Sequence, residues 1–530
     1  MFGFWPQSLP AVYPAIMPVL DRMRFTEIVE QHIGKLWDNG VSHADVLIVL
    51  LLLILDQGRM WPIADVDDWA EQFGIQMLLG IDSAQLHHDK IGYTLDTLVP
   101  VDADGAPDLS VITQMEYELA HEAISNWGIP VDMLHYDFTD VSLSGVFEGS
   151  ELARKGRGPG RRQFELGLNV TAEGGFPILS TAHAGATSHM AAVPDNLKAL
   201  IQRLPGRSFC VIADAGAMCY DNARAYEEAG QHFIASRQLQ PHEKQKLAEI
   251  DPEAFEPARY QAPGGGRYWL HEQLEELSPR NKEGSVTLRS IAIVSETKRR
   301  DRQSHARRQM RKLLERLTEI ADYAGGRGNY RNREYVQQMA EKALAKARDA
   351  GRFVTVHVSD EPALDWTVDW AGFVDYRRRL GRYRLYTNLP ADEYSADEVL
   401  ELYHGRHVVE HSYRQLKSQL KIAPIHLHKD NRLYALVWLY VMALMVLSLL
   451  QLLARRAGLT TPRDYPLTAR ALLKELKAVD ALAARQGGRL CATVAPLQER
   501  AQYYLDTLGF PDPQHWLTVP PCDPPDISGK

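Results

Sequence analysis

Three acidic side chains in this sequence have surroundings that suit metal-dependent chemistry. Asp137 lies in the β-rich stretch LHYDFTD, and Asp214 follows the apolar stretch CVIA, two residues before Gly216, which permits a sharp turn. Glu410 lies in the charged stretch YHGRHVVEHSYRQLKSQL. Carboxylate oxygens suit Mg²⁺ and Mn²⁺, and two such ions can activate the attacking oxygen and stabilise the leaving oxygen in phosphodiester chemistry. An aspartate at a strand end can also simply begin a turn, so each acid alone has a structural interpretation.

The charged stretch around Glu410 reads as a helix. Tyr403, Arg406, Glu410 and Lys417 follow one another at offsets of three, four and seven, which puts all four on one helical face. One interpretation is a solvated face on which Arg406 and Glu410 form an ion pair one turn apart. A very apolar stretch follows directly, which favours the other interpretation, a site packed on a sheet.

Two kinds of element would have to position these acids. Residues 1 to about 125 have the pattern of helices, with Ser42 and Asp89 as expected N-caps, and the pattern changes to strands after Pro130. A hairpin is expected to turn at residues 173–175. The segments that follow it alternate between helix and strand, and they are a helix over 194–204, a strand FCVIADAG, a helix DNARAYEEAG closed by Gly230, and a strand HFIAS. The pattern predicts a mixed sheet in an α/β domain.

After Arg237 the alternation of helix and strand is interrupted for roughly 160 residues. This segment contains the strand-like stretches SIAIVSE, RFVTVHVS and RYRLYTN and the basic helical stretch KRRDRQSHARRQMRKLLERL. We interpret it as a β-rich insertion with its own small sheet. From Thr460 onward we expect one or two helices and a disordered tail.

Charge is strongly segregated along the chain, although the net charge is only −9. The first hundred residues contain 5 Lys and Arg against 13 Asp and Glu, whereas residues 296–352 contain 16 against 8. Local basic faces govern phosphate binding, so this contrast matters more than the sum. The four cysteines include no CxxC pair, and the N-terminus lacks the pattern of a signal peptide, so we expect a cytoplasmic protein.

One stretch raises the question of a membrane. Residues Leu433–Ala454 are about as long and apolar as a spanning helix. Because the charged stretch precedes it directly and no second such stretch exists, we favour a buried core helix, with a membrane span as the alternative. The shorter run Val46–Leu55 also reads as a core helix.

Together these residues resemble bacterial insertion-sequence transposases of the DDE class that carry a β-rich insertion. Tyr403, Arg406, Glu410 and Lys417 match the Y-(2)-R-(3)-E-(6)-K signature of that family. Asp137 in HYDFTDVSLSG and Asp214 in VIADAGAMCYDN are similar to its first and second catalytic aspartates, and LYTNL is similar to the segment that leads out of its insertion. The resemblance covers roughly residues 15–460.

The resemblance implies a ribonuclease-H-like mixed-sheet core in which Asp137, Asp214 and Glu410 hold two Mg²⁺ ions, with Mn²⁺ able to substitute. Asp214 and Glu410 are 196 positions apart (410 − 214), more than such a core needs, and the family places its insertion there. The implied partners are double-stranded DNA, both the terminal inverted repeats and the target, and a second copy of the chain in a homodimer. The implied contacts to DNA near the cleaved end are Tyr403, Arg406, Arg414 and Lys417.

The expected organisation has five parts. They are a helical N-terminal domain for DNA binding or dimerisation (1–128), the first part of the core (129–237), the insertion (238–390), the second part of the core (391–458) and a C-terminal helical region with its tail (459–530).

One position departs from the family pattern. Asp140 stands where the family often has a hydroxyl residue, although Thr139 keeps a hydroxyl nearby. In a strand Asp140 would point away from the face of Asp137. We therefore assign the first catalytic position to Asp137 and keep Asp140 as the alternative.

Further basic and aromatic residues are candidates for DNA contacts. A basic glycine-rich loop and the start of the basic helix could follow a DNA backbone or could be solvated. Trp366 and Trp370 could stack on an unpaired base, with core packing as the alternative. The basic candidates are Arg154, Lys155, Arg161 and Arg162 in the loop and Lys298, Arg299 and Arg300 in the helix.

Histidines also crowd the candidate site. His404, His407 and His411 recur at a spacing that can bind zinc, but their face is offset from the acidic one. We interpret them, with His135, as structural or close to DNA.

These observations predict a DNA transposase that cuts the ends of a mobile element and joins them to target DNA. Two alternatives stay open: a metal-dependent nuclease with the same core that never joins strands, and a non-catalytic DNA-binding descendant.

Overall fold

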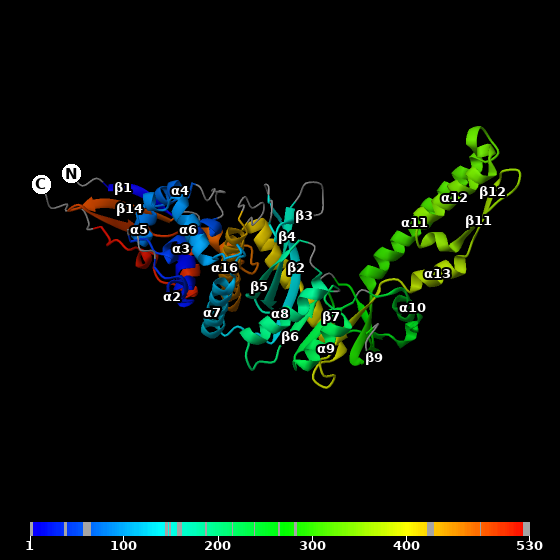
Figure 1. Cartoon of the computed structure of the whole chain (residues 1–530), viewed down its shortest axis with the longest axis horizontal. Helices are drawn as coiled ribbons and strands as arrows, with labels where there is room; N and C mark the ends of the chain where they lie inside the picture. Colours follow the sequence, from blue (N-terminus) through cyan, green and yellow to red (C-terminus); the bar gives the residue numbers. More distant parts are fainter. Residues whose placement is uncertain are drawn as a thin grey trace. The chain divides into compact units, whose positions relative to one another are not determined.

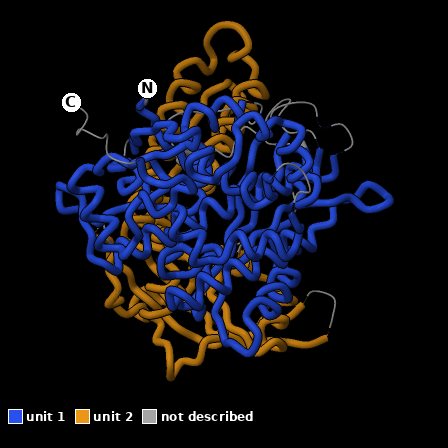
Figure 2. Tube along the Cα trace, turned by 90° about the vertical axis from the view of Figure 1, so that its left-hand side faces the viewer, with its two compact units in different colours: residues 1–213, 405–530 blue, residues 214–404 orange. Residues whose placement is uncertain are grey.

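The computed structural model describes residues 4–35, 40–56, 65–143, 147, 150–155, 162–185, 188–214, 216–237, 239–262, 265–279, 283–420, 429–476 and 479–522. The chain divides into two compact units, which Figure 2 colours separately. The first unit comprises residues 1–213 and 405–530, and the second comprises residues 214–404. The fold is mixed α/β, as expected. The five-part division of the chain stays a prediction.

The N-terminal part of the first unit is helical, as predicted. Ser42 caps α3 through a capping box with Asp45. The predicted cap at Asp89 is wrong, because α6 begins one residue earlier and Asp89 lies inside its first turn. The helices are α1 (Tyr13–Arg22), α2 (Phe25–Ile33), α3 (His43–Leu55), α4 (Val66–Gln72), α5 (Ile75–Leu79), α6 (His88–Leu98) and α7 (Ser110–Trp127).

The sheet of the first unit carries the first candidate acid. Its strands run in the order β3-β4-β2-β6, with β5 beside β4. β2 pairs antiparallel with β4 and parallel with β6, so the sheet is mixed. The bounds are β2 (Met133–Leu143), β3 (Arg154–Lys155), β4 (Arg162–Thr171), β5 (Pro177–Ala184) and β6 (Cys210–Ala213).

Two details near this sheet bear on the predictions. The hairpin of β4 and β5 turns where expected, and Gly174 and Gly175 both have a positive φ. The next helix, α8 (His189–Arg203), begins more than a turn before Pro194, so its predicted start was too late.

The long apolar helix α16 (Asp430–Arg456) lies inside the first unit (Figure 1). Within the described part of the chain it is the one helix long and apolar enough to cross a membrane, and 89% of its most apolar 18-residue window is buried by protein. It packs against α1, α3, α6, α7 and β5. This burial agrees with the interpretation of a core helix, since apolar side chains all around a helix need protein on every side.

A second sheet in the first unit was not predicted. It has the order β1-β14-β15 and joins β1 (Phe4–Leu9) near the start of the chain to β14 (Val479–Gln486) and β15 (Arg489–Val494). The expected C-terminal helices exist as α17 (Ala469–Leu476) and α18 (Glu499–Thr507), but two strands lie between them. The predicted disordered tail lies mostly outside the described residues.

The second unit has a sheet with the order β7-β13-β10-β9-β8. β13 pairs with both β7 and β10, so most strands of the predicted insertion extend a sheet that begins before it. The expectation of a separate small sheet is correct only for the hairpin of β11 and β12. The bounds are β7 (His232–Ser236), β8 (Glu256–Pro257), β9 (Tyr268–Leu277), β10 (Val286–Ser295), β13 (Arg382–Thr387), α9 (Tyr220–Glu228), α10 (Pro241–Glu249) and α14 (Ala396–His404).

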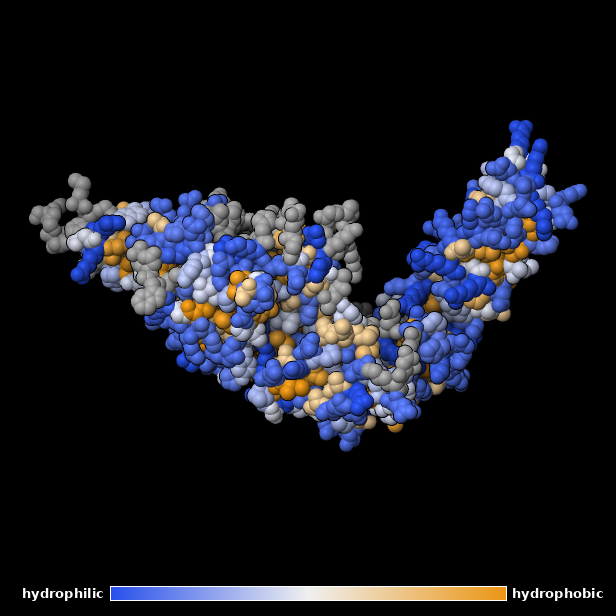
Figure 3. All heavy atoms as spheres, in the orientation of Figure 1, coloured by the Kyte–Doolittle hydropathy of each residue, from blue (hydrophilic) through white to orange (hydrophobic). Residues whose placement is uncertain are grey.

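Residues 296–378 of the second unit form what we call the helical arm. Its elements are α11 (Glu296–Tyr323), α12 (Arg333–Lys346), β11 (Val354–Val358), β12 (Leu364–Val368) and α13 (Trp370–Arg378). They enclose a small apolar core that includes Met310, Leu317 and Phe373. The outer surface of α11 and α12 is largely hydrophilic (Figure 3).

Candidate active site

Both candidate aspartates follow the last paired residues of two neighbouring parallel strands. Tyr136 of β2 is the register partner of Ala213, the last residue of β6. Asp137 and Asp214 are the next residues along the chain from these two positions. Because the two strands run in the same direction, the residue after each member of this pair is an aspartate at the same level along the strands.

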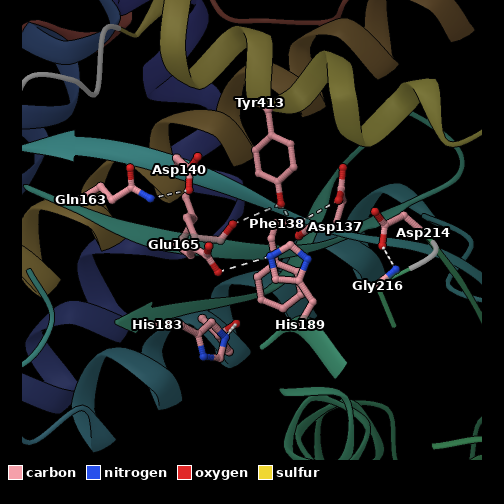
Figure 4. Close-up of polar contacts among 12 residues, drawn as sticks. Asp137, Phe138, Asp140, Gln163, Glu165, His183, His189, Asp214, Gly216 and Tyr413 are labelled. Atoms are coloured by element: carbon pink, nitrogen blue, oxygen red, sulfur yellow. Dashed lines mark hydrogen bonds and ion pairs between the residues drawn. The ribbon is translucent and has the colours of Figure 1, made fainter. Parts of the chain in front are cut away.

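Each aspartate accepts a short-range hydrogen bond from the backbone. Asp137 Oδ1 accepts from the amide of Phe138 at 2.9 Å, and Asp214 Oδ1 accepts from the amide of Gly216 at 2.8 Å. The second bond closes an Asx turn directly after β6. Figure 4 shows both contacts.

Glu410 lies on α15 (His407–Arg414), a short helix that packs on β2 and β4. Its side chain is 54% exposed, and its carboxylate lies 4.0 Å from the Arg406 guanidinium, at the limit of an ion pair. Such an exposed pair contributes little to stability. The predicted ion pair between Arg406 and Glu410 therefore exists but is loose.

The prediction of one continuous helix through the charged stretch is wrong. α14 ends at His404, a turn occupies residues 405–406, and α15 then begins at His407. Tyr403 consequently lies on a different helix, in the second unit, and does not share a helical face with Glu410. Gly405 explains the break, because glycine is a poor helix former.

The helix changes again before Lys417. Residues Gln415–Gln419 form a π-helical turn, which alters the rotation per residue and removes Lys417 from the regular spacing that the sequence suggested. Partial burial lowers the pKa of the Lys417 ammonium, and the nearby charge of Asp140 opposes that shift. Arg414 is exposed on the last turn of α15.

Two buried hydroxyl groups dock α15 onto the sheet. The Tyr413 hydroxyl donates to the carbonyl oxygen of Asp137 and lies 3.3 Å from that of Leu166 on β4. Ser412 Oγ lies 3.2 Å from the Val408 carbonyl oxygen of its own helix and 3.4 Å from the Gly175 carbonyl oxygen, and its one proton is shared between these two acceptors. Gly175 has no room for a side chain, since an added Cβ would lie 2.9 Å from a methyl carbon of Val408. Sequence reasoning missed the roles of these residues, although the helical spacing of Tyr413 and Glu410 could have suggested the first.

Asp140, the alternative first acid, has a different environment from Asp137. Asp140 Oδ1 accepts a hydrogen bond from Gln163 Nε2 at 2.9 Å (Figure 4). The α15 hydroxyl contact goes to the peptide of Asp137 instead. The choice of Asp137 over Asp140 as the first catalytic acid stays a prediction.

The histidines have structural partners. Burial, together with His407 and Arg406, lowers the pKa of His135 to about 4, so its imidazole is neutral at pH 7. His404 stacks on Tyr260 and lies 3.2 Å from the Tyr383 hydroxyl. Across the described part of the chain, no three His, Cys, Asp or Glu side chains lie together as a ready-made metal site. The histidine spacing therefore makes no zinc site there, and Asp137, Asp214 and Glu410 are likewise not gathered into one cluster.

The basic candidates divide into engaged and exposed residues. The Lys298 ammonium lies 4.1 Å from the ring centroid of Tyr383, and the Arg299 guanidinium lies 5.3 Å from that of Trp269, whereas Arg300 is exposed. Arg154 and Arg162 are exposed on the paired strands β3 and β4. The side chain of Lys155 and all of Arg161 lie outside the described residues.

The two tryptophans of the helical arm differ. Trp366 packs against the apolar core of the arm, as its alternative interpretation expected. Trp370 is 53% exposed and lines an open groove of about 470 Å³ with Val374 and Arg377. Core packing is therefore the role of Trp366, not of Trp370.

Comparison with known proteins assigns the chain to a family. Residues 134–446, more than half of the chain, match the family described as Transposase DDE domain. The chain belongs to this family. The resemblance drawn from the motifs is thus confirmed for the DDE transposase domain, and a family of this kind is generally dependent on divalent metal ions. The four-residue signature and the insertion-sequence origin stay predictions.

Two further comparisons concern curated proteins and solved structures. No curated protein matched this transposase chain. Among solved structures, it is similar to a piggyBac transposase in a synaptic complex with hairpin DNA, with a TM-score of 0.41 and 8% sequence identity over 99% of this chain and 89% of the other.

Proposed function

We propose that this DDE transposase cuts DNA at the ends of an insertion sequence and joins the freed ends to target DNA. The observation that carries the proposal is the strand register that leads to Asp137 and Asp214, together with the docking of the Glu410 helix onto the peptide of Asp137. All three acids lie within the matched residues 134–446. A ribonuclease-H-like core is the arrangement that we infer for these strands.

The donor set of this site suits a hard divalent cation. Asp137, Asp214 and Glu410 offer only carboxylate oxygens, which Mg²⁺ and Mn²⁺ prefer. We expect two Mg²⁺ ions, with Mn²⁺ able to substitute. When bound, they would supply activation of the attacking oxygen and charge stabilisation of the leaving oxygen.

The cations around Glu410 would orient the scissile strand. The Arg406 guanidinium lies 4.0 Å from the Glu410 carboxylate, and its planar shape suits a phosphate bound through two hydrogen bonds. Lys417 would act as a point charge, and its lowered pKa is consistent with a partly enclosed position. Arg414 and Tyr403 are proposed as further contacts to DNA.

The proposed reaction has two phosphoryl-transfer steps. Water first attacks the phosphodiester at the element end, and the P–O bond to the 3′-oxygen breaks to free a 3′-hydroxyl. This hydroxyl then attacks the next phosphodiester, in the target or, to form a hairpin, in the opposite strand. A P–O bond to the attacking 3′-oxygen forms, the P–O bond to the 3′-oxygen of the attacked strand breaks, and that oxygen leaves as a new 3′-hydroxyl. Asp137, Asp214 and Glu410 would hold the divalent cations during both steps, and Arg406 and Lys417 would bind the phosphate, which bare carboxylates would repel.

The partners follow from this reaction. The substrates are double-stranded terminal repeats and target DNA, and joining two ends calls for a homodimer. The exposed residues Arg154, Arg162 and Arg300, with Lys155 and Arg161, are proposed contacts to the DNA backbone; Lys298 and Arg299 would first have to leave their aromatic rings. We place the protein in the cytoplasm.

A strand-transfer assay tests the proposal. The inverted repeats that flank the gene supply the end DNA, and the products are cut ends and joined ends resolved by electrophoresis in Mg²⁺. We expect both products from the native chain and neither from D137A, D214A or E410A, each folded by circular dichroism. Cutting without joining would instead identify a nuclease, absence of both would favour a non-catalytic descendant, and full activity of E410A would exclude the site.

A further inference from the structure

Tyr413 lies between the helix that carries Glu410 and the strand that carries Asp137. It lies three residues after Glu410 on α15, and its side chain is buried, with 6% of the residue exposed. Its hydroxyl points to the sheet and meets the carbonyl oxygen of Asp137 (Figure 4). One residue therefore links the helix of one carboxylate to the peptide of the other.

The contact fixes α15 against two strands together. The carbonyl oxygen of Leu166 on β4 lies 3.3 Å from the same hydroxyl, so a single donor sits between neighbouring strands. The peptide carbonyl and the side chain of Asp137 share one Cα, and a shift of α15 along the strand would change the distance between the carboxylates of Asp137 and Glu410. The Ser412 bond to Gly175 secures the same helix farther from Asp137.

We propose that Tyr413 is a positioning residue that sets the spacing of the Asp137 and Glu410 carboxylates for a divalent cation. The proposal rests on the function proposed above. Groups that hold metal ligands in place, without touching the metal, typically contribute about 10–100-fold to metal affinity or activity. Tyr413 is suited to this role because it is buried, rigid and bonded to the ligand-bearing strand itself.

The test is Mn²⁺ binding to the full-length protein, measured from the paramagnetic resonance signal of the free ion. Y413F keeps the ring and removes only the hydroxyl, and we expect about 10-fold weaker Mn²⁺ binding. The matched control is Y13F, since the buried Tyr13 hydroxyl also donates to a backbone carbonyl, that of Pro513 at 3.1 Å, without involving any residue of the candidate site. Y13F should bind Mn²⁺ as the native protein does.

Two comparisons separate positioning from general destabilisation. S412A loosens the same helix but keeps the Tyr413 hydroxyl, so it should weaken Mn²⁺ binding less than Y413F. All variants are compared below the unfolding temperature of the least stable one. In cleavage assays, Y413F should need about 10-fold more Mg²⁺ for half-maximal rate and regain most of the native rate at saturating Mg²⁺.

Each outcome bears on one proposal. If Y413F binds Mn²⁺ normally while D137A and E410A do not, the role of Tyr413 is refuted and the site stands. If D137A and E410A bind as the native chain does, the site itself is refuted. Equal losses in Y413F and S412A, or in Y413F and Y13F, would show that loosening the fold, not the Tyr413 contact, is responsible, and would overturn the positioning role.

Discussion

Two charged helices of this transposase hold their place by different means. α11, in the helical arm, is 28 residues long and buries a regular stripe of Met310, Leu313, Leu317 and Ile320 under an exposed basic surface. α15 has only eight residues and is held by the hydroxyl groups of Tyr413 and Ser412 as well as by apolar packing. A long helix can be fixed by its apolar stripe alone, whereas a short one needs directional bonds.

The two helices also differ in what their charged side chains contact. On α11 the charged side chains form ion pairs within the helix, such as Arg311 with Glu315 at 3.7 Å, and both side chains are about two-thirds exposed. On α15 Glu410 is 54% exposed and lies 4.0 Å from Arg406, on a helix that packs on β2, the strand that carries Asp137. We therefore expect charge to matter on α15 and packing to matter on α11.

The largest expected effect is the loss of catalysis when the charge on α15 is removed. E410Q keeps the size of the side chain but removes its negative charge, and we expect cleavage to fall by about 10³-fold or more, as when one member of a catalytic unit is lost. Single-turnover cleavage of element-end DNA measures it. The matched change on α11, E315Q, should leave the rate within about two-fold. Equal effects would mean that the helices do not differ in this way.

The same contrast explains which parts of the molecule were predictable. α11 was predicted because its apolar stripe repeats at helical spacing over many turns. The hairpin at Gly174 and Gly175 was also predicted, since local turn chemistry determines it. Asp214 was recognised from its immediate neighbours as an acid that directly follows a strand. The prediction that Asp137 also stands at a strand end was wrong, because β2 continues beyond it to Leu143, paired with β4.

The parts that were missed depend on long-range packing. β1 pairs with β14 across more than 400 residues, and short strands of that kind leave only a weak local pattern. The break at Gly405 was overlooked because the face formed by Tyr403, Arg406 and Glu410 looked continuous. The helical spacing of Tyr413 and Glu410 could have drawn attention to Tyr413, but its partner, the carbonyl oxygen of Asp137, depends on the position of β2.

The second-largest expected effect is a loss of stability when apolar packing is removed from α11. Leu317 is fully buried, so L317A should lower the free energy of unfolding of the arm by about 2–5 kcal/mol through lost burial and a cavity. Thermal unfolding followed by calorimetry measures the change. L274A, at a residue that is 73% exposed on β9, is the control and should change stability by less than about 0.5 kcal/mol. A small effect of L317A would contradict the role of the stripe.

The third prediction tests how closely α15 fits its support. Gly175 has φ = +66°, and an added Cβ would lie 2.9 Å from Val408 Cγ1 and 3.1 Å from Ser412 Oγ. G175A should therefore cost roughly 2–3 kcal/mol, from backbone strain plus crowding of α15, and should slow cleavage.

Gly128, which ends α7, separates the two causes of that cost. It has φ = +57° with no atom within 4 Å of an added Cβ, so G128A should cost only the strain, about 1 kcal/mol, and leave cleavage unchanged. Chemical denaturation and the cleavage assay are run on both variants. Equal costs and rates would show that Gly175 does not determine the position of α15.

The smallest expected effect is a loss of stability when a partly buried ion pair is removed, which can be compared with the removal of a solvated pair on α11. Arg432 of α16 donates to both carboxylate oxygens of Asp96 on α6, at 2.8 and 2.6 Å, and these bonds lower the pKa of Asp96 below its usual 3.8. A lowered folded pKa stabilises the protein above the unfolded value and is lost as pH falls through the folded one. D96N should thus cost about 1–2 kcal/mol at pH 7, and the difference from the native chain should shrink as pH falls below 3.8. E315Q on α11 removes a pair that is exposed to water and should cost at most about 0.5 kcal/mol at pH 7. A cost of D96N that is the same at every pH would contradict the role of the pair between Asp96 and Arg432.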